Sequence, residues 1–318
     1  MPFGFGKPKL IRYLEKNPNV KTVLVAGSYG RKSAIRALGI ILGQKFTVSF
    51  GYNPNVQAEI ILLDYESAES MPAFNPDITV VTAVRNEEEA QKYFAAANRS
   101  KATIINISDV PEEFMYHLQN ENAVTYGDEL PANYYFENTA QNFEGQEGDI
   151  VNLDGEHIPI KIRILGEHNV RPVLMACAVG RFFGMTREEI LNGIADIAPI
   201  HGRMSPARGI NGSYIIDDSA DGTPSSVQYG LRAIYSMEAP ARTIVTNNLE
   251  ELGEPNYDML SDVLILTDDI PETTPNPCVH FFNDSLALMN YLGQRAEENG
   301  IVLLEIPMPE IIEEYLWQ

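Results

Sequence analysis

The chain has few residues of the kinds that build metal centres and disulfide scaffolds. Its 318 residues include two cysteines, Cys177 and Cys278. Cys177 lies in the apolar run 173–179, which predicts a buried thiol, and neither cysteine has the spacing of a metal-ligand pair. This usage excludes a disulfide-rich secreted fold and suits a reducing compartment, so we expect a cytoplasmic protein.

Positive charge is also scarce. The chain has 23 Lys and Arg against 44 Asp and Glu, which gives a formal net charge of −21. A protein this acidic is not expected to bind nucleic acid or an anionic membrane through general electrostatic attraction. An anionic ligand would need a local basic pocket.

Long apolar runs and histidine clusters are missing as well. No apolar run reaches the ~18 to 20 residues of a membrane-spanning helix, and the first residues lack the basic and apolar regions of a signal peptide. Most of the histidines lack ligand spacing and are predicted to be structural or surface residues; they are His117, His157, His201 and His280. The acidic run 87–89 is predicted to be a solvated helix start.

The most informative segment that is present is a glycine turn. It reads Gly27-Ser28-Tyr29-Gly30-Arg31-Lys32-Ser33 and follows the apolar run 23–26. The backbone N–H groups of such a turn, a nearby cation and the start of the next helix form a phosphate site. The match to G-x-x-x-x-G-K-[ST] is imperfect, because Arg31 separates Gly30 from Lys32 and residue 26 is alanine. An ordinary strand-to-helix turn is therefore the alternative.

Strands and helices alternate around this turn. Strands are predicted at 22–26, 59–64, 77–82 and 102–106, and helices at 9–16, 33–44 and 87–98. This alternation predicts a doubly wound parallel sheet, which binds ligands at the carboxyl ends of its strands. The glycine turn, Asp64, Thr82 and Asn106 all fall at such ends.

The second half of the chain begins with a β-rich stretch and ends with another α/β pattern. Residues 123–163 are predicted to be β-rich, with a turn at Asp154-Gly155, and helices follow at 170–183 and 187–197. After a hinge at 198–203, strands are predicted at 213–217, 243–246, 263–267, 279–282 and 301–304, and helices at 224–237, 285–299 and 310–317. This second pattern predicts a smaller, Rossmann-like α/β domain.

Several short motifs occur in a fixed order along the chain. They are Gly27-Ser28-Tyr29-Gly30-Arg31-Lys32, the segment 76–82, Gly166-Glu167-His168-Asn169-Val170, Gly202-Arg203-Met204, the segment 217–224 and Glu251-Leu252-Gly253. In this order they resemble the Mur ligases, the ATP-dependent amide ligases of peptidoglycan synthesis, and most of all the branch that adds D-alanyl-D-alanine. The resemblance implies a helical segment at 1–20, a central ATP-binding domain with a phosphate loop at 21–200 and a C-terminal domain at 201–318.

The resemblance also implies a reaction and a set of site residues. ATP and Mg²⁺ activate a carboxylate as an acyl phosphate, which the amine of an amino acid or peptide then attacks. Gly27 to Ser33 would hold the phosphates, with Arg31 in the place of the family lysine if the loop has no insertion and Lys32 if it has one. The remaining roles follow by motif position: Ser33 and Asp64 for the metal, His168 and Asn169 for the nucleotide and metal region, Asp218 for the ribose and Arg203 for the phosphates as the domains close.

The chain departs from the family pattern at several positions. Thr82 is followed by Ala83 where the family motif continues toward a histidine, Pro172 replaces an asparagine, and Glu305-Ile306-Pro307 replaces a late K-G-S. Few residues precede the loop, so we expect no UDP-binding domain there, and a protein partner could supply it. A Mur-like protein that binds a nucleotide or a partner without ligating anything is the main alternative, and an unrelated phosphate-loop kinase is a minor one. Purely structural roles also stay open: a strand end or cap for Asp64, a turn for Asp218, packing for His168 and a salt bridge for Arg203.

Overall fold

The computed structural model describes residues 9–68, 74–128, 130–220 and 224–316. The chain forms two compact units that are not continuous in sequence. Unit 1 comprises residues 1–138, 148–160 and 170–197, and unit 2 comprises residues 139–147, 161–169 and 198–318. Each unit is built around its own sheet.

Unit 1 contains a parallel sheet with the strand order β2-β3-β1-β4-β5-β6. Its strands are β1 (Lys21–Ala26), β2 (Val48–Phe50), β3 (Ile60–Asp64), β4 (Ile78–Val81), β5 (Ala102–Asn106) and β6 (Ala123–Tyr126). The central strands are almost entirely buried, as expected for a parallel sheet covered on both faces. At the carboxyl edge, β1, β4 and β5 are followed by short loops, and β3 is followed directly by a short helix.

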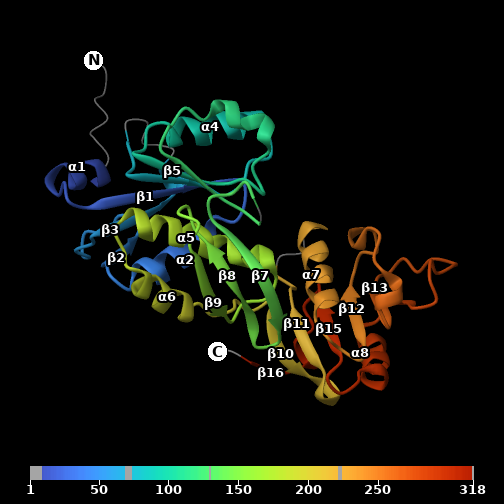
Figure 1. The fold of residues 1–318 in the computed structure, drawn as a ribbon. Helices are drawn as coiled ribbons and strands as arrows, with labels where there is room; N and C mark the ends of the chain where they lie inside the picture. The colour runs from blue at the N-terminus through green and yellow to red at the C-terminus, as the bar shows by residue number, and fades with distance from the viewer. Residues whose placement is uncertain (1–8, 69–73, 129, 221–223, 317–318) are drawn as a thin grey trace. The chain divides into compact units, whose positions relative to one another are not determined.

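Helices cover both faces of this sheet (Figure 1). They are α1 (Lys9–Lys16), α2 (Arg31–Leu42), α3 (Tyr65–Ala68), α4 (Glu87–Ala97), α5 (Arg171–Phe182) and α6 (Arg187–Ala195), with the 3₁₀ turn η1 at Glu112–His117. Helix α4 lies on one face, and α2 lies on the other, where it packs against α5 and α6. The Asn86 side chain caps α4 by accepting from the Glu89 N–H, and Thr186 begins α6 with a capping box.

A small sheet with the order β7-β8-β9 contributes to both units. Its strands are β7 (Tyr135–Asn142), β8 (Gly145–Val151) and β9 (His157–Ile162). The turn between β8 and β9 contains Gly155 at φ 73°, which confirms the turn predicted at Asp154-Gly155. The boundary between the units passes through all of these strands, so each strand has residues in both units.

Unit 2 contains a mixed sheet with the order β14-β13-β12-β15-β11-β10-β16. Its strands are β10 (Ser205–Gly209), β11 (Tyr214–Asp217), β12 (Arg242–Thr246), β13 (Asp262–Leu266), β14 (Val279–Phe282), β15 (Ile301–Leu304) and β16 (Ile312–Tyr315), and its helices are α7 (Pro224–Ser236) and α8 (Ser285–Arg295). The 3₁₀ turns are η2 (Glu167–Val170, whose last residue belongs to unit 1), η3 (Ile210–Gly212), η4 (Glu250–Leu252), η5 (Tyr257–Met259) and η6 (Pro309–Ile311). The strands from β14 to β11 run parallel, whereas β10 pairs antiparallel with both β11 and β16.

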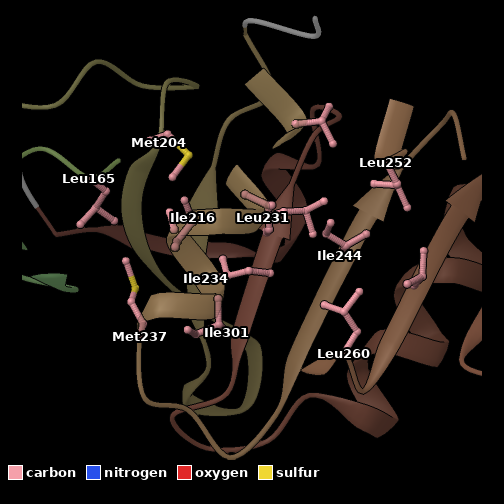
Figure 2. Close-up of a cluster of buried hydrophobic side chains, with 14 of the residues drawn as sticks. Leu165, Met204, Ile216, Leu231, Ile234, Met237, Ile244, Leu252, Leu260 and Ile301 are labelled. Carbon is pink, nitrogen blue, oxygen red and sulfur yellow. The ribbon is translucent and has the colours of Figure 1, made fainter. Parts of the chain in front are cut away.

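The core of unit 2 lies between α7 and the sheet (Figure 2). Leu231 and Ile234 of α7 pack with Ile216, Ile244 and Ile301 of the strands. Leu165, which precedes unit 2's main segment by more than thirty positions in the numbering, is fully buried in the same cluster. The unit therefore needs residues from a distant part of the chain to complete its core.

The doubly wound parallel sheet and the smaller α/β unit confirm the predicted fold class, but some elements differ. The helix predicted at 310–317 is wrong: residues 312–315 form β16, which pairs with β10, and residue 317 lies outside the described residues. The helix predicted at 285–299 ends at Arg295, and β2 and β10 were not predicted. Helix α2 begins at Arg31, two residues earlier than predicted.

Two expectations from composition concern membrane-spanning helices and the state of the cysteines. Among the described residues, no helix combines the length and apolar character needed to cross a membrane. Both cysteines are free thiols; Cys177 is buried and Cys278 is half-buried. Burial raises the pKa of Cys177 to about 12 and also raises the pKa of Cys278.

The two thiols should therefore differ in reactivity. With a pKa of about 12, Cys177 is thiolate in only about one molecule in ten thousand at pH 8, and it is also shielded from reagents. Ellman's reagent should titrate one thiol, Cys278, in the native protein at pH 8 and both thiols in urea. A Cys278→Ser variant should lose the native reaction, and rapid native labelling of Cys177 would contradict this account.

Shortening a buried side chain in the core of unit 2 should lower the free energy of unfolding. Ile234→Ala removes a fully buried side chain from the cluster, and such changes typically cost about 2–5 kcal/mol. Urea unfolding followed by circular dichroism should show a clearly lower midpoint for this variant. Ile270→Ala, at a side chain that is 50% exposed, should leave the midpoint nearly unchanged.

Candidate active site

The candidate site in unit 1 is the loop that joins β1 to α2. Gly27 has φ 149° and Gly30 has φ 79°, both in the region that favours glycine. A Cβ atom added to Gly27 would lie 2.1 Å from Thr82 Oγ1, so no side chain fits there. Helix α2 starts directly after Gly30, and no side chain caps its N-terminus. An uncapped helix start behind a glycine turn is a suitable place for an anion.

Side chains from neighbouring elements hold the loop in this shape. Thr82 Oγ1 donates to the Tyr29 carbonyl at 2.5 Å from the end of β4. Ser28 Oγ donates to Glu89 Oε2 at 2.5 Å, and the Tyr29 hydroxyl donates to Asp109 Oδ1 at 3.1 Å. The acidic run 87–89 begins α4, as predicted, but Glu89 is half-buried and contacts the loop.

The Arg31 side chain lies across the loop. Its Nη1 donates to the Gly27 carbonyl at 2.5 Å and its Nε donates to Asp64 Oδ2 at 3.2 Å, while Nη2 forms an ion pair with Glu66. Burial lowers the pKa of Arg31, but attraction and hydrogen bonds from Asp64 and Glu66 outweigh it and leave the pKa raised. The guanidinium is therefore charged and already paired with two carboxylates.

Lys32 and Ser33 follow as the second and third residues of α2. Arg31 thus takes the position directly after the positive-φ glycine, which the lysine holds in G-K-[ST], and Lys32 takes the hydroxyl position. Lys32 is exposed and Ser33 is half-buried. The roles of these residues stay predictions.

The surroundings of Asp64 do not form a ready-made magnesium site. Asp64 Oδ2 accepts from Arg31 and Oδ1 accepts from the Glu66 N–H at 3.0 Å. Among the described residues, no group of three or more His, Cys, Asp or Glu side chains is arranged to hold a metal ion. Mg²⁺ favours carboxylate and water oxygens, whereas Asp64 Oδ2 is already paired with the Arg31 guanidinium. The metal roles of Ser33 and Asp64 stay predictions.

A network of mostly buried polar side chains contacts the loop through Asp109, and the sequence alone did not predict it. Arg171, the first residue of α5, donates to Asp109 Oδ2 at 2.7 Å and binds both carboxylate oxygens of Asp128. Asn106 Nδ2 joins Asp109 Oδ2 to the Thr82 carbonyl. The position of Asn106 at a strand end was a signal for this network, but nothing local marked Arg171, because its partners lie far away in the sequence.

The other predicted site residues belong to unit 2. Asp218 is buried after β11 and its Oδ1 accepts from the Met204 N–H at 3.0 Å, next to Arg203. The Gly202 carbonyl accepts from the Ala220 N–H at 2.8 Å, so the Gly202-Arg203 turn is fixed beside Asp218. Residues 221–223 of the predicted motif at 217–224 lie outside the described residues.

His168 and Asn169 lie in η2. The His168 ring stacks on Tyr229 of α7 with centroids 4.3 Å apart, and Asn169 Nδ2 donates to the Leu165 carbonyl at 2.8 Å. The predicted residues thus form two groups: the loop residues and Asp64 lie in unit 1, and the other four, His168, Asn169, Arg203 and Asp218, lie in unit 2. Their roles also stay predictions.

Comparison with known proteins gives the same family as the motifs. Residues 73–180 match the Mur ligase middle domain family. The chain is 24% identical over 192 residues to a UDP-N-acetylmuramoyl-tripeptide–D-alanyl-D-alanine ligase of Bacillus subtilis, a match that covers 57% of this chain and 41% of that protein. The chain thus spans about two-fifths of the length of this curated relative.

Solved structures share the fold. The MurF ligase of Thermotoga maritima in complex with ADP superposes with a TM-score of 0.71 at 17% identity, covering 94% of this chain and 79% of that one. A folylpolyglutamate synthase of Mycobacterium tuberculosis, complexed with ADP and AMPPCP, has a TM-score of 0.66 at 12% identity, covering 93% and 91%. In sequence and in fold, this chain is therefore similar to the Mur ligases, and its residues 73–180 match the family of their middle domain.

Proposed function

We propose that the protein is an ATP-dependent ligase that joins a carboxylate to the amine of an amino acid or peptide, as a step in peptidoglycan precursor synthesis. One observation carries this proposal: the uncapped start of α2 behind Gly27 and Gly30, with Arg31 and Lys32 in its first turn. Similarity to ligases of this kind supports it. A cytoplasmic location follows from the need for ATP and agrees with two free thiols.

In the proposed reaction, a substrate carboxylate oxygen bonds to the γ-phosphorus of ATP as the bond to the β-phosphate oxygen breaks and ADP leaves. The amine nitrogen then bonds to the carbonyl carbon, the carbon–oxygen bond to phosphate breaks, and the amine proton passes to solvent. Such reactions depend mainly on positioning and on charge stabilisation by amides and cations.

In this reaction, different residues of the chain would bind different parts of ATP. The amides at the start of α2 and the cations Arg31 and Lys32 would hold the phosphates. Asp218 would contact the ribose, and His168, Asn169 and Arg203 would complete nucleotide binding. Magnesium would arrive on the phosphate oxygens of ATP, because the described residues offer no ready-made set of ligands. A protein partner that contributes a UDP-binding domain is part of the same proposal.

A second candidate function is nucleotide binding without ligation. The ion pairs of Arg31 with Asp64 and Glu66 favour it, because they neutralise the loop cation that a phosphate would otherwise meet. Both candidates require ATP to bind at the loop, and only the first requires turnover. Two experiments separate them.

The first experiment locates the phosphates. Calorimetric titration with Mg-ATP should show binding that falls roughly ten- to hundredfold in Arg31→Ala, because a charge-assisted contact is lost. The same titration with Lys32→Ala tests the neighbouring cation. Lys21→Ala is the matched control, since Lys21 is an exposed cation at the opposite end of β1. Equal affinity in all three variants would remove the loop from the proposal.

The second experiment measures turnover. Phosphate release from Mg-ATP should require both an acid and an amine, with UDP-N-acetylmuramoyl-tripeptide and D-alanyl-D-alanine as the first pair. Gly27→Ala should lower the rate at least about a hundredfold, since its Cβ would lie 2.1 Å from Thr82 Oγ1 and force the loop out of position. Gly155→Ala is the control, because that positive-φ glycine has no atoms close to an added Cβ. ATP binding without turnover on any acid and amine would favour the second candidate.

A further inference from the structure

The segment that follows β4 lies against the glycine loop of unit 1. Both the backbone N–H and the Oγ of Ser28 donate to the Ala83 carbonyl, at 3.1 and 3.3 Å. One residue earlier, Thr82 Oγ1 donates to the Tyr29 carbonyl. Two consecutive residues of the segment therefore contact two consecutive residues of the loop.

Arg85 continues this segment and is also tied to the loop. Its guanidinium carbon lies 5.4 Å from the centroid of the Tyr29 ring, which is within the range of a cation–π contact. Its backbone N–H donates to Glu89 Oε2 at 3.0 Å, and the same oxygen accepts from Ser28 Oγ. The backbone and the side chain of Arg85 thus both lie beside the loop.

The Arg85 guanidinium differs from that of Arg31 in its partners. Arg31 is paired with the carboxylates of Asp64 and Glu66. Arg85 is exposed, and in the part of the chain that the structure describes its side chain has neither an ion pair nor a hydrogen bond. The aromatic ring beneath it does not neutralise its charge. Arg85 therefore brings to the loop a cation that no carboxylate has taken.

The Tyr29 ring is a fixed support for this cation. Its backbone carbonyl is held by Thr82, and its hydroxyl donates to Asp109 Oδ1 at 3.1 Å. Asp109 is itself held by Arg171. The ring remains 46% exposed, so these contacts fix it without covering it.

The chemistry proposed for this loop needs a cation at the outermost phosphate. The γ-phosphate of ATP carries the most charge, and an anionic carboxylate must approach it, so the two reacting groups repel each other. A guanidinium at that phosphate lowers the repulsion, and its planar fork can donate two N–H groups to phosphate oxygens.

We propose that Arg85 is a further phosphate-binding residue, which contacts the γ-phosphate of ATP from the β4 side of the loop. Tyr29 is a positioning residue whose ring holds the guanidinium there. The proposal rests on the proposed binding of ATP at this loop. It implies that Arg85 distinguishes ATP from ADP, because ADP lacks the group that Arg85 contacts.

The test is calorimetric titration of the full chain with Mg-ADP and with the magnesium complex of AMPPNP, an ATP analogue that is hydrolysed slowly. Arg85→Ala should weaken AMPPNP binding about tenfold or more, because a charge-assisted contact is lost, and should leave ADP binding unchanged. Arg85→Lys keeps the charge without the planar fork, so its loss of AMPPNP affinity should be smaller.

The role of Tyr29 is read from the ratio of the two affinities. Tyr29→Leu removes the aromatic support and should lower the preference for AMPPNP over ADP. Tyr29→Phe keeps the ring and should keep that preference, even if loss of the bond to Asp109 weakens the binding of both nucleotides. A purely structural role of Tyr29 would give the same ratio in both variants.

Arg99→Ala is the matched control. Arg99 is an exposed arginine just beyond the C-terminal end of α4, whereas Arg85 lies just before the N-terminal end of the same helix. This variant should bind both nucleotides as the native protein does.

The outcomes that overturn the proposal are distinct. If Arg85→Ala weakens both nucleotides equally, Arg85 acts on the shape of the loop and does not contact the γ-phosphate. If it changes neither affinity, as in Arg99→Ala, Arg85 has no role in nucleotide binding, while the proposed function stands. If the native protein binds neither nucleotide, the proposed function itself fails, and the role of Arg85 fails with it.

Discussion

The close approach of Gly27 to Thr82 is the constraint on which the rest of the site depends. With no side chain at residue 27, the backbone passes within contact of the Thr82 hydroxyl, and that hydroxyl fixes the Tyr29 carbonyl. The turn is then narrow enough for α2 to begin at once after Gly30. Because Thr82 directly follows β4, the neighbouring strand sets the shape of the loop, and the network through Asn106, Asp109 and Arg171 supports that strand end.

The two cations in the first turn of α2, Arg31 and Lys32, have different surroundings. Arg31 points into the loop and is balanced by Asp64 and Glu66, so it costs the free protein little electrostatic repulsion. Lys32 is exposed, and together with Arg36 it leaves positive charge on the outer face of α2. Two adjacent basic residues that look equivalent in the sequence therefore belong to different surfaces. A phosphate at the loop would have to compete with carboxylates for Arg31 but not for Lys32.

Much of the fold could be predicted because its signals are local. The buried strands of unit 1 are continuous apolar runs, and the glycine turn lies directly between β1 and α2. Features that depend on contacts with residues far away in the sequence could not be predicted. Residues 312–315 have no helical contacts but pair with β10, so tertiary pairing overrides the helix propensity of their glutamates. Glu89 and Arg171 likewise gained their roles from Ser28 and Asp109, which are remote in the sequence.

The interleaving of the two units has a consequence for how the chain can be divided. A cut near residue 198 would leave the C-terminal piece without residues 139–147 and 161–169, and with them Leu165 of its apolar core. It would also leave the N-terminal piece carrying strand halves that belong to the other unit. Recombination or fragment expression at that boundary would therefore separate Leu165 from the apolar core in which it is buried.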